Sequence, residues 1–386
     1  MTPPLPQTAV PTTLMRGGTS RGPFFLESDL PPVGELRDRV LLAVMGSPHP
    51  LQVDGVGGGN PLTSKAGVVA LSPEPDIDLD FTFGQLRPES DTVQFTANCG
   101  NLLAAVLPFA IERGLITPVG DRTTATIRTT NTGLLASVTV VTPLVEGTDR
   151  RFVAYDGDTR IAGVGATSSP VEISFLDTAG SVVGQLLPTG NLTDDLVLPD
   201  TRTVSATLID NGQPLVVLRA DELGIAGVEP PHELENEHAL KRGLEALRLQ
   251  AGELMGLGDV SSVSYPKMTL VSPPSGDGVG ALSTRSFIPH TVHRSIGVLA
   301  AVTVATAACM PGTVAATVAE AGEGRERTLT VEHPSGGFPV HLTFDEHGDV
   351  VSSGITRTAR NIMVGAVNVS PSVWSPGRTN QKGPAK

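Results

Sequence analysis

Residues 94–114, which read Gln-Phe-Thr-Ala-Asn-Cys-Gly-Asn-Leu-Leu-Ala-Ala-Val-Leu-Pro-Phe-Ala-Ile-Glu-Arg-Gly, decide the fold. Their apolar part, Leu102 to Ile111, carries no charge on any face. A helix that is apolar all round must be buried. We therefore predict a strand that runs into a central buried helix, with Asn98 as its N-cap and Gly100 and Asn101 in its first turn.

Cys99 lies at the start of this predicted helix. Unpaired backbone amides and the helix dipole favour both a thiolate and a bound carboxylate at such a position. The structural alternative is a core cysteine that happens to cap a buried helix, since free cysteine is among the most buried residue types. Cys99 alone does not decide between these two interpretations.

The composition narrows the class of protein. The 386 residues include 43 Gly and 32 Pro with only 17% charged residues, which indicates a turn-rich and strand-rich chain long enough for two domains. The net charge of −13 argues against nucleic acid and against an anionic membrane surface as partners. The longest uncharged apolar run, Ser295 to Met310, is too short to span a bilayer. Two cysteines provide neither a disulfide framework nor a Cys-Cys metal spacing, and the N-terminus lacks a secretory signal, so we expect a cytoplasmic protein.

Two glycine-rich stretches precede residue 94. In the segment 12–27, two short strands flank the turn Gly17-Gly-Thr-Ser, whose amides and hydroxyls suit an anion, although a plain hairpin would read the same way. In the segment 54–72, the glycine spacing matches neither a dinucleotide fingerprint nor a P-loop. Lys65 stands there at the mouth of a buried strand, where a partly desolvated amine can carry a proton; a merely solvated lysine is the alternative.

Other elements follow from the same patterns. A short helix is predicted over Glu35 to Met45, strands over 124–142 around a turn at 129–133, and further short strands over 151–176. The charged, leucine-periodic segment Pro231 to Met255 predicts a surface helix.

The second half of the chain repeats the first. Four motifs recur in order, roughly 193 to 203 residues apart, which indicates a duplicated domain. The hairpin 204–218, Lys267, the helix from Ile296 and the turn at 332–337 match the hairpin of 12–27, Lys65, the Cys99 helix and the turn at 129–133. We place the two domains at residues 1–190 and 191–375, with a final strand near 360–370 that can pair with the first domain and a flexible tail at 376–386.

Two such domains would face their helix starts toward one another across a cleft. The second half then offers Lys267, His290, Thr291 and His293 opposite Cys99. These histidines could equally cap or anchor their loop. Cys309, at the end of the second helix, is predicted to be core.

Five motifs carry a resemblance to a known family. They are Met15-Arg-Gly-Gly-Thr-Ser-Arg-Gly-Pro-Phe-Phe, Asp54-Gly-Val-Gly-Gly-Gly-Asn-Pro-Leu-Thr-Ser-Lys, Asn98-Cys-Gly-Asn, Pro289-His-Thr-Val-His-Arg and Glu332-His-Pro-Ser-Gly. The chain resembles, over roughly residues 12–370, the PrpF-like isomerases of the diaminopimelate-epimerase-like superfamily. That branch includes 2-methylaconitate isomerase, methylitaconate Δ-isomerase and 4-oxalomesaconate tautomerase.

The resemblance implies an α+β fold of two pseudo-symmetric domains, each a β-sheet rolled around a central buried helix. It implies a site between the domains, no cofactor and no metal, and Lys65 and Cys99 as the proton-transfer pair. The epimerases of the superfamily have a second cysteine where this chain reads His290-Thr-Val-His, a departure that argues against a two-cysteine racemase. The substrate contacts that we expect are Arg16, Gly18, Thr19, Ser20, Thr63, Ser64, Asn98, Gly100, Asn101, Lys267, His290, Thr291, His293 and Ser335.

The implied reaction moves a proton and a C=C bond in a small anionic di- or tricarboxylate, by a keto-enol or an allylic shift. The motifs most resemble the 4-oxalomesaconate enzymes of aromatic-acid catabolism, with methylaconitate and methylitaconate as alternative substrates. A cysteine hydrolase that uses Cys99 and His293 and a non-catalytic carboxylate-binding protein are the alternatives from other classes. The sequence does not say which of Lys65 and Cys99 removes the proton, and it leaves a homodimer open.

Overall fold

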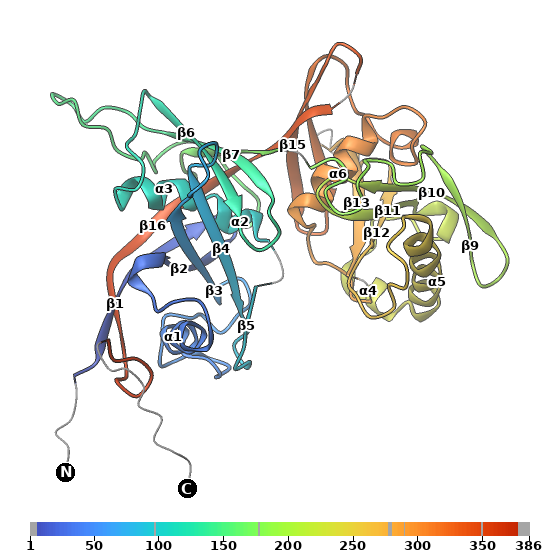
Figure 1. The fold of residues 1–386 in the computed structure, drawn as a ribbon. Helices are drawn as coiled ribbons and strands as arrows, with labels where there is room; N and C mark the ends of the chain where they lie inside the picture. Colours follow the sequence, from blue (N-terminus) through green and yellow to red (C-terminus); the bar gives the residue numbers. More distant parts are fainter. Residues whose placement is uncertain are drawn as a thin grey trace, which may run out of the picture. The chain divides into compact units, whose positions relative to one another are not determined.

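A computed structural model describes residues 6–95, 98–176, 178–276, 280–288, 290–348 and 350–376. Tertiary contacts divide the chain into two compact units (Figure 1). Unit 1 comprises Met1–Gly133, Val138–Val171 and Arg357–Lys386, and unit 2 comprises Leu134–Ser137 and Glu172–Thr356. Residues 172–190 therefore lie in unit 2, while the domain limits at 190 and 191 stay a prediction. The predicted strand end at 96–97 and the predicted tail beyond 376 fall outside the described residues.

Unit 1 is a mixed sheet with a helix inside it and a helix outside it. Its strands are β1 (Thr8–Gly17), β2 (Ser20–Leu26), β3 (Lys65–Leu71), β4 (Leu79–Leu86), β5 (Val93–Gln94), β6 (Arg122–Thr129) and β7 (Leu135–Val141), the last beginning in unit 2. They are hydrogen-bonded in the order β1-β2-β3-β4-β6-β7, with β5 beside β4. The helix α1 spans Glu35–Met45, as predicted, after a short 3-10 turn at Glu27–Asp29.

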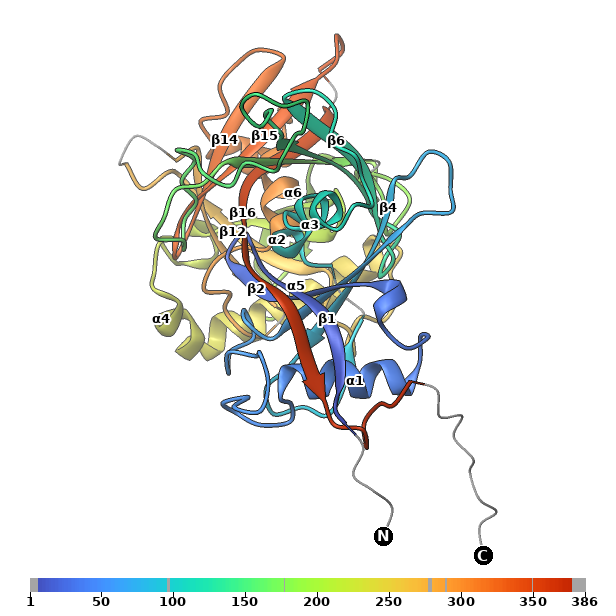
Figure 2. The same cartoon turned by 90° about the vertical axis from the view of Figure 1, so that its left-hand side faces the viewer.

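The central helix of unit 1 is buried, as predicted, but it is not continuous. It consists of α2 (Gly100–Leu103) and α3 (Val106–Glu112), enclosed by strands in Figure 2. The break has a local cause: Pro108 has no amide hydrogen and its ring would clash with the carbonyl four residues earlier, at Ala104. The ring of Phe109 packs against Phe24, with centroids 5.6 Å apart. The predicted N-cap was wrong by one residue, because Cys99 rather than Asn98 caps α2.

Unit 2 has the same plan. Its strands are β8 (Pro170–Leu176), β9 (Asp194–Val197), β10 (Thr203–Asp210), β11 (Pro214–Arg219), β12 (Lys267–Ser272), β13 (Leu282–Phe287), β14 (Glu326–His333), β15 (Gly336–Phe344) and the first part of β16 (Val350–Val369). They follow the order β8-β16-β15-β14-β13-β12-β11-β10-β9. The helix α6 (Val298–Ala308) is buried from Ala300 onward and packs against β10, β11, β14 and β15.

Three further features, two in unit 2 and the segment 151–169 in unit 1, qualify the sequence predictions. The predicted helix over 231–255 is two helices, α4 (Pro231–Asn236) and α5 (His238–Leu254), which are separated at Glu237. The described segment 151–169 contains isolated bridges rather than the predicted short strands. Short 3-10 turns occupy Asp221–Leu223 and Ala315–Thr317.

Strand directions confirm the internal duplication. The pairs β1-β2, β2-β3 and β3-β4 are antiparallel, parallel and antiparallel, and β10-β11, β11-β12 and β12-β13 repeat this series. The next pairs, β4-β6 and β13-β14, are both parallel. In each unit the third strand of the series begins with a lysine, Lys65 or Lys267. The two lysines therefore occupy equivalent places in two copies of one motif.

The last strand of the chain returns to the first. β16 runs through residue 356 in unit 2 and continues into unit 1, where Ala359 to Val369 pair antiparallel with β1. Val369 and Val10 are both buried in the core that covers α1.

Candidate functional site

In unit 1, a glycine turn sits on the first turn of the central helix. Gly18 has a φ of 51°, and a Cβ there would lie 2.1 Å from Oδ1 of Asn101. A Cβ on Gly17 would lie 2.5 Å from the carbonyl oxygen of Asn101. The amide of Thr19 donates to Asn101 Oδ1 at 3.4 Å. Only glycine permits this approach, which brings the hydroxyl residues after the turn to the start of α2.

Cys99 is half-buried and caps α2 through its sulfur. The amide of Leu102 donates to Sγ at 3.5 Å, and the carbonyl oxygen of Cys99 accepts from Leu103 at 3.0 Å. An amide that points at sulfur stabilises negative charge on it. Next to it, the side chain of Asn98 donates to the hydroxyl of Thr132 in the turn after β6. Asn98 Oδ1 is buried and has no partner among the described residues.

Lys65 is buried at the first position of β3 and is held by a neutral group. Its Nζ donates to Gln85 Oε1 at 2.6 Å and lies 4.9 Å from the ring centre of Phe83. Gln85 Nε2 in turn donates to the carbonyls of Pro61 and Ser64, at 3.1 and 3.0 Å, which fixes the amide orientation. Among the described residues no carboxylate forms an ion pair with Lys65. Sequence reasoning did not identify Gln85, because only the β3-β4 register places it opposite Lys65.

Several residues of unit 1 that are predicted to contact the substrate already form hydrogen bonds within the protein. The guanidinium of Arg16 donates to the carbonyls of Gly18, Thr358 and Ala359 and to the hydroxyls of Thr358 and Ser168. Burial, and then the charge of Arg360, lower the pKa of Arg16. Ser64 is buried against Gln52 and Asn60, and Thr63 donates to the Asn60 carbonyl at 3.2 Å. Ser20 differs, because its buried Oγ has no partner among the described residues.

In unit 2, Lys267 and His293 form a neighbouring pair. Lys267 Nζ donates to Gln213 Oε1 at 3.0 Å, and burial lowers the pKa of Lys267. Burial, and then the positive charge of Lys267, lower the pKa of His293. The amide of Ser295 donates to His293 Nδ1 at 2.9 Å, which assigns the remaining proton of the neutral ring to Nε2. His293 is thereby arranged as a neutral hydrogen-bond donor.

Ser335 lies in the tight turn between β14 and β15. Its hydroxyl donates to the carbonyl of Arg294, and its amide donates to His333 Nδ1 at 3.1 Å. The same nitrogen lies 3.3 Å from the hydroxyl of Ser295. The turn is therefore tied to the loop that carries His293. His333 and Ser295 were not predicted as site residues, although His333 lies inside a motif that the sequence singled out.

His290 and Thr291 are exposed residues shortly before His293. His290 is exposed, and its Nδ1 is 3.7 Å from Glu245 Oε2 on α5. Thr291 is exposed, and its carbonyl accepts from Ile288 at 2.9 Å. The predicted substrate contacts of these two residues stay predictions.

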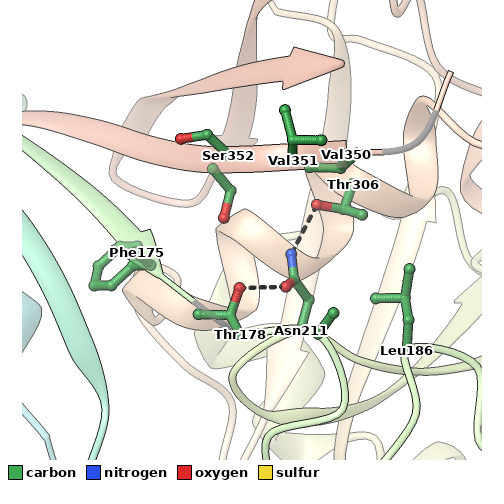
Figure 3. A pocket seen from close by; sticks show the side chains of 10 residues that line it. Phe175, Thr178, Leu186, Asn211, Thr306, Val350, Val351 and Ser352 are labelled. Carbon is green, nitrogen blue, oxygen red and sulfur yellow. Dashed lines mark hydrogen bonds between the residues drawn. The ribbon is translucent and has the colours of Figure 1, made fainter. Parts of the chain in front are cut away.

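A cavity of about 150 Å³ in unit 2 lies away from the predicted site residues (Figure 3). Asn211 links Thr178 and Thr306 in a hydrogen-bonded chain along its wall, at 2.5 and 2.9 Å. Phe175, Leu186 and Val351 provide apolar lining. No predicted site residue lines it. In the part of the chain that the structure describes, three or more His, Cys, Asp or Glu side chains do not gather as metal ligands.

Comparison with known proteins assigns the family. A model of the PrpF protein family matches residues 7–370. The chain belongs to the PrpF family. One relative, the (4E)-oxalomesaconate Delta-isomerase of Novosphingobium sp. (strain KA1), is 50% identical to this chain, over 94% of this chain and 98% of that protein. The 4-oxalomesaconate tautomerase of Pseudomonas putida is 47% identical, over 95% of this chain and 98% of that protein. The 3-methylitaconate isomerase of Eubacterium barkeri is 34% identical, over 94% of this chain and 98% of that protein.

Solved structures confirm the fold. A crystal structure of methylitaconate-delta-isomerase superposes with a TM-score of 0.85 at 32% identity, covering 98% of this chain and 100% of that one. A hydroxyproline epimerase shares the fold alone, with a TM-score of 0.50 at 14% identity over 94% and 93%. The predicted α+β, epimerase-like fold of two similar units is thus confirmed, and the chain is an isomerase of the PrpF family. The helices of the described residues include none that is long and apolar enough to cross a membrane.

Proposed function

We propose that this isomerase acts on 4-oxalomesaconate and shifts a proton between two carbons of it, with Lys65 and Cys99 as the proton-transfer groups. The observation that carries the proposal is the likeness, at 50% and 47% identity over nearly the whole chain, to two proteins named for oxalomesaconate. The hydrolase and the non-catalytic alternatives are not retained, because relatives that match more than nine-tenths of the chain are named as isomerases.

Two features of unit 1 support the catalytic pair. Lys65 is buried, its Nζ donates to the neutral amide of Gln85, and no carboxylate among the described residues pairs with it. Cys99 Sγ accepts an amide hydrogen bond at the helix start. One group can remove a proton next to a carbonyl or carboxylate, and the other can return a proton at the far carbon. Positioned acid and base groups contribute about 10²–10⁴-fold to such reactions.

The intermediate is a dienolate, whose negative charge needs hydrogen-bond donors. In unit 1 we assign Thr19, the buried hydroxyl of Ser20, and the Gly100 and Asn101 amides to this task. In unit 2 we assign Nε2 of the neutral His293 ring, while Ser335, whose hydroxyl donates to the Arg294 carbonyl, holds the loop that carries His293. Preorganised donors of this kind are worth about 3–4 kcal/mol each when removed from an active site.

A substrate panel tests the reaction. We expect turnover of 4-oxalomesaconate to exceed that of 2-methylaconitate and methylitaconate by at least 100-fold in kcat/KM. NMR of the product distinguishes a tautomer from an allylic isomer, the two outcomes for which the relatives are named. Preference for either of the other acids would overturn the assigned substrate.

Deuterium exchange tests the two catalytic roles. Lys65→Ala and Cys99→Ser should each lower kcat by at least about 10²-fold. In heavy water, the variant that lacks the reprotonating group should still exchange deuterium at the starting carbon, and the variant that lacks the abstracting group should not. Cys309→Ser is the matched control, because Cys309 is buried at the end of α6 and should affect stability rather than turnover. Full turnover without either Lys65 or Cys99 would reduce that residue to a binding role.

The cytoplasmic location and a homodimer also stay proposals. Cell fractionation and light scattering of the purified protein would test them.

A further inference from the structure

Arg21 differs from most of the other arginines that are not exposed. It is the second residue of β2 and is half-buried, and its Nε is buried without a hydrogen-bond partner. Nine other arginines that are not fully exposed each donate from the guanidinium to at least one oxygen: Arg16, Arg37, Arg113, Arg128, Arg151, Arg219, Arg248, Arg285 and Arg327. The Arg21 guanidinium has no acceptor among the described residues, although the chain carries 40 acidic residues. A half-buried guanidinium without a hydrogen-bond acceptor destabilises the folded protein unless a bound anion accepts its hydrogen bonds.

Arg16, on the neighbouring strand β1, differs from Arg21 in its hydrogen bonds. Arg16 lies directly opposite Arg21 in the β1-β2 ladder, so the two side chains leave the same face. The Arg16 guanidinium reaches five oxygen acceptors, and it holds the strand β16 and the Gly18 turn. Arg21 therefore adds a second positive charge next to one that is already committed to structure. This neighbourhood favours a negative ligand at Arg21.

The loop before Lys65 runs close to Arg21. A Cβ on Gly58 would lie 2.9 Å from Arg21 Nη2 and 2.4 Å from Thr63 Oγ1, so only glycine lets the loop backbone approach the guanidinium this closely. The Arg21 amide donates to the carbonyl of Leu62 at 3.0 Å, which fastens β2 to the end of the same loop. Thr63 and its loop lead directly into Lys65.

Arg21 also lies close to the catalytic strand. The next residue, Gly22, touches Lys65, since a Cβ on Gly22 would lie 1.9 Å from the Lys65 carbonyl oxygen. A planar guanidinium matches the two oxygens of a carboxylate. We propose that Arg21 binds a carboxylate of the substrate that does not take part in the proton shift, and thereby selects polycarboxylates over acids with fewer carboxylates. This inference rests on the proposed function.

The test compares ligands that differ by one carboxylate. Tricarballylate and glutarate serve as non-reacting probes in calorimetric titrations of the full-length protein. In the wild type we expect tricarballylate to bind more tightly than glutarate. Arg21→Met should weaken tricarballylate by about 10- to 100-fold, as expected for a lost charged hydrogen bond, and glutarate much less. Arg21→Lys, which keeps the charge without the fork, should recover part of the loss.

Kinetics provide the second measurement. For 4-oxalomesaconate, Arg21→Met should raise KM by at least tenfold and change kcat by no more than about threefold. Arg87→Met is the matched control, because Arg87 is exposed on the loop after β4, and it should change neither ligand preference nor KM. Equal losses of tricarballylate and glutarate in Arg21→Met, or no loss of either, would overturn the inference.

Failure of this inference is distinguishable from failure of the proposed function. If the protein does not turn over 4-oxalomesaconate, the proposed substrate is wrong. The tricarballylate and glutarate titrations still decide whether Arg21 binds a carboxylate. If turnover is observed and Arg21→Met leaves KM unchanged, only the assignment of Arg21 is wrong.

Discussion

Single residues show which parts of the site can be predicted from sequence. Lys65 and Cys99 stand in long motifs, so their importance was readable before the structure. Their partners were not readable, because Gln85 and Gln213 meet Lys65 and Lys267 only through strand pairing across 20 and 54 residues of chain. The predicted cap was misplaced for a similar reason: the side chain of Asn98 is used by Thr132, which leaves the capping position to Cys99.

At the same scale, the titration of His293 can be predicted. Burial and Lys267 lower the pKa of His293, so its NMR midpoint should lie below the usual 6.5. Lys267→Met removes a neighbouring positive charge and should raise the midpoint, while Lys267→Arg should keep it low. Just below pH 6.5, His293 is protonated in the unfolded chain but still neutral in the native state. The contribution of His293 to the free energy of unfolding is therefore fully present above about pH 6.5 and is lost as the pH falls from that value through the lower pKa of the native state. A midpoint at or above 6.5 in the wild type would contradict this assignment.

Among the elements, α4 and α5 lie between β11 and β12 as α1 lies between β2 and β3, but together they are longer than α1 and they support part of the candidate site. The buried side chain of Arg248 donates to the carbonyls of Val263 and Tyr265, in the segment that leads into Lys267, and pairs with Glu245. On α4, Glu235 accepts from the amide of Val292, next to His293. The sequence showed a surface helix, but the helix is also a support for two loops of the candidate site.

Arg248→Met tests this support. The substitution removes the guanidinium from the half-buried Glu245 and from the carbonyls of Val263 and Tyr265, and losing hydrogen bonds to a charged group costs about 1.5–3 kcal/mol. We expect lower stability in urea and a lower kcat/KM. Arg242→Met on the same helix is the control, because Arg242 is exposed and should change neither quantity. Wild-type activity and stability in Arg248→Met would show that α5 does not support the site.

At the scale of the whole molecule, the duplication was visible in the sequence because motif order survives divergence. The path of β16 was less visible, since alternation along a strand of 20 residues does not say where one compact unit ends and the other begins. The loops between 151 and 169 were misjudged, because isolated bridges and continuous strands share the same apolar alternation. Local patterns thus predicted the elements, and long-range pairing decided how they are joined.

Val369→Asp tests the role of the final strand. Val369 is 2% exposed at the far end of the chain, so the substitution buries an unpaired charge in unit 1 and should cost about 3–5 kcal/mol. Hydrogen exchange should accelerate in β1 and leave α6 of unit 2 protected. Val364→Asp on the same strand is the control, because Val364 is 66% exposed and its variant should exchange like the wild type. Equal exchange in both variants would show that β16 does not complete the core of unit 1.

The return of β16 to β1 also sets an order for biosynthesis. Arg16 leaves the ribosome 342 residues before its partner Thr358, a delay of roughly 20–70 s at ordinary rates of translation. The apolar side of β1 must stay unaggregated throughout this interval, while all the residues of unit 2 emerge and can pair with one another. Unit 1 is therefore begun first and finished last, and the nascent chain is most exposed to chaperones and proteases just before its end is made.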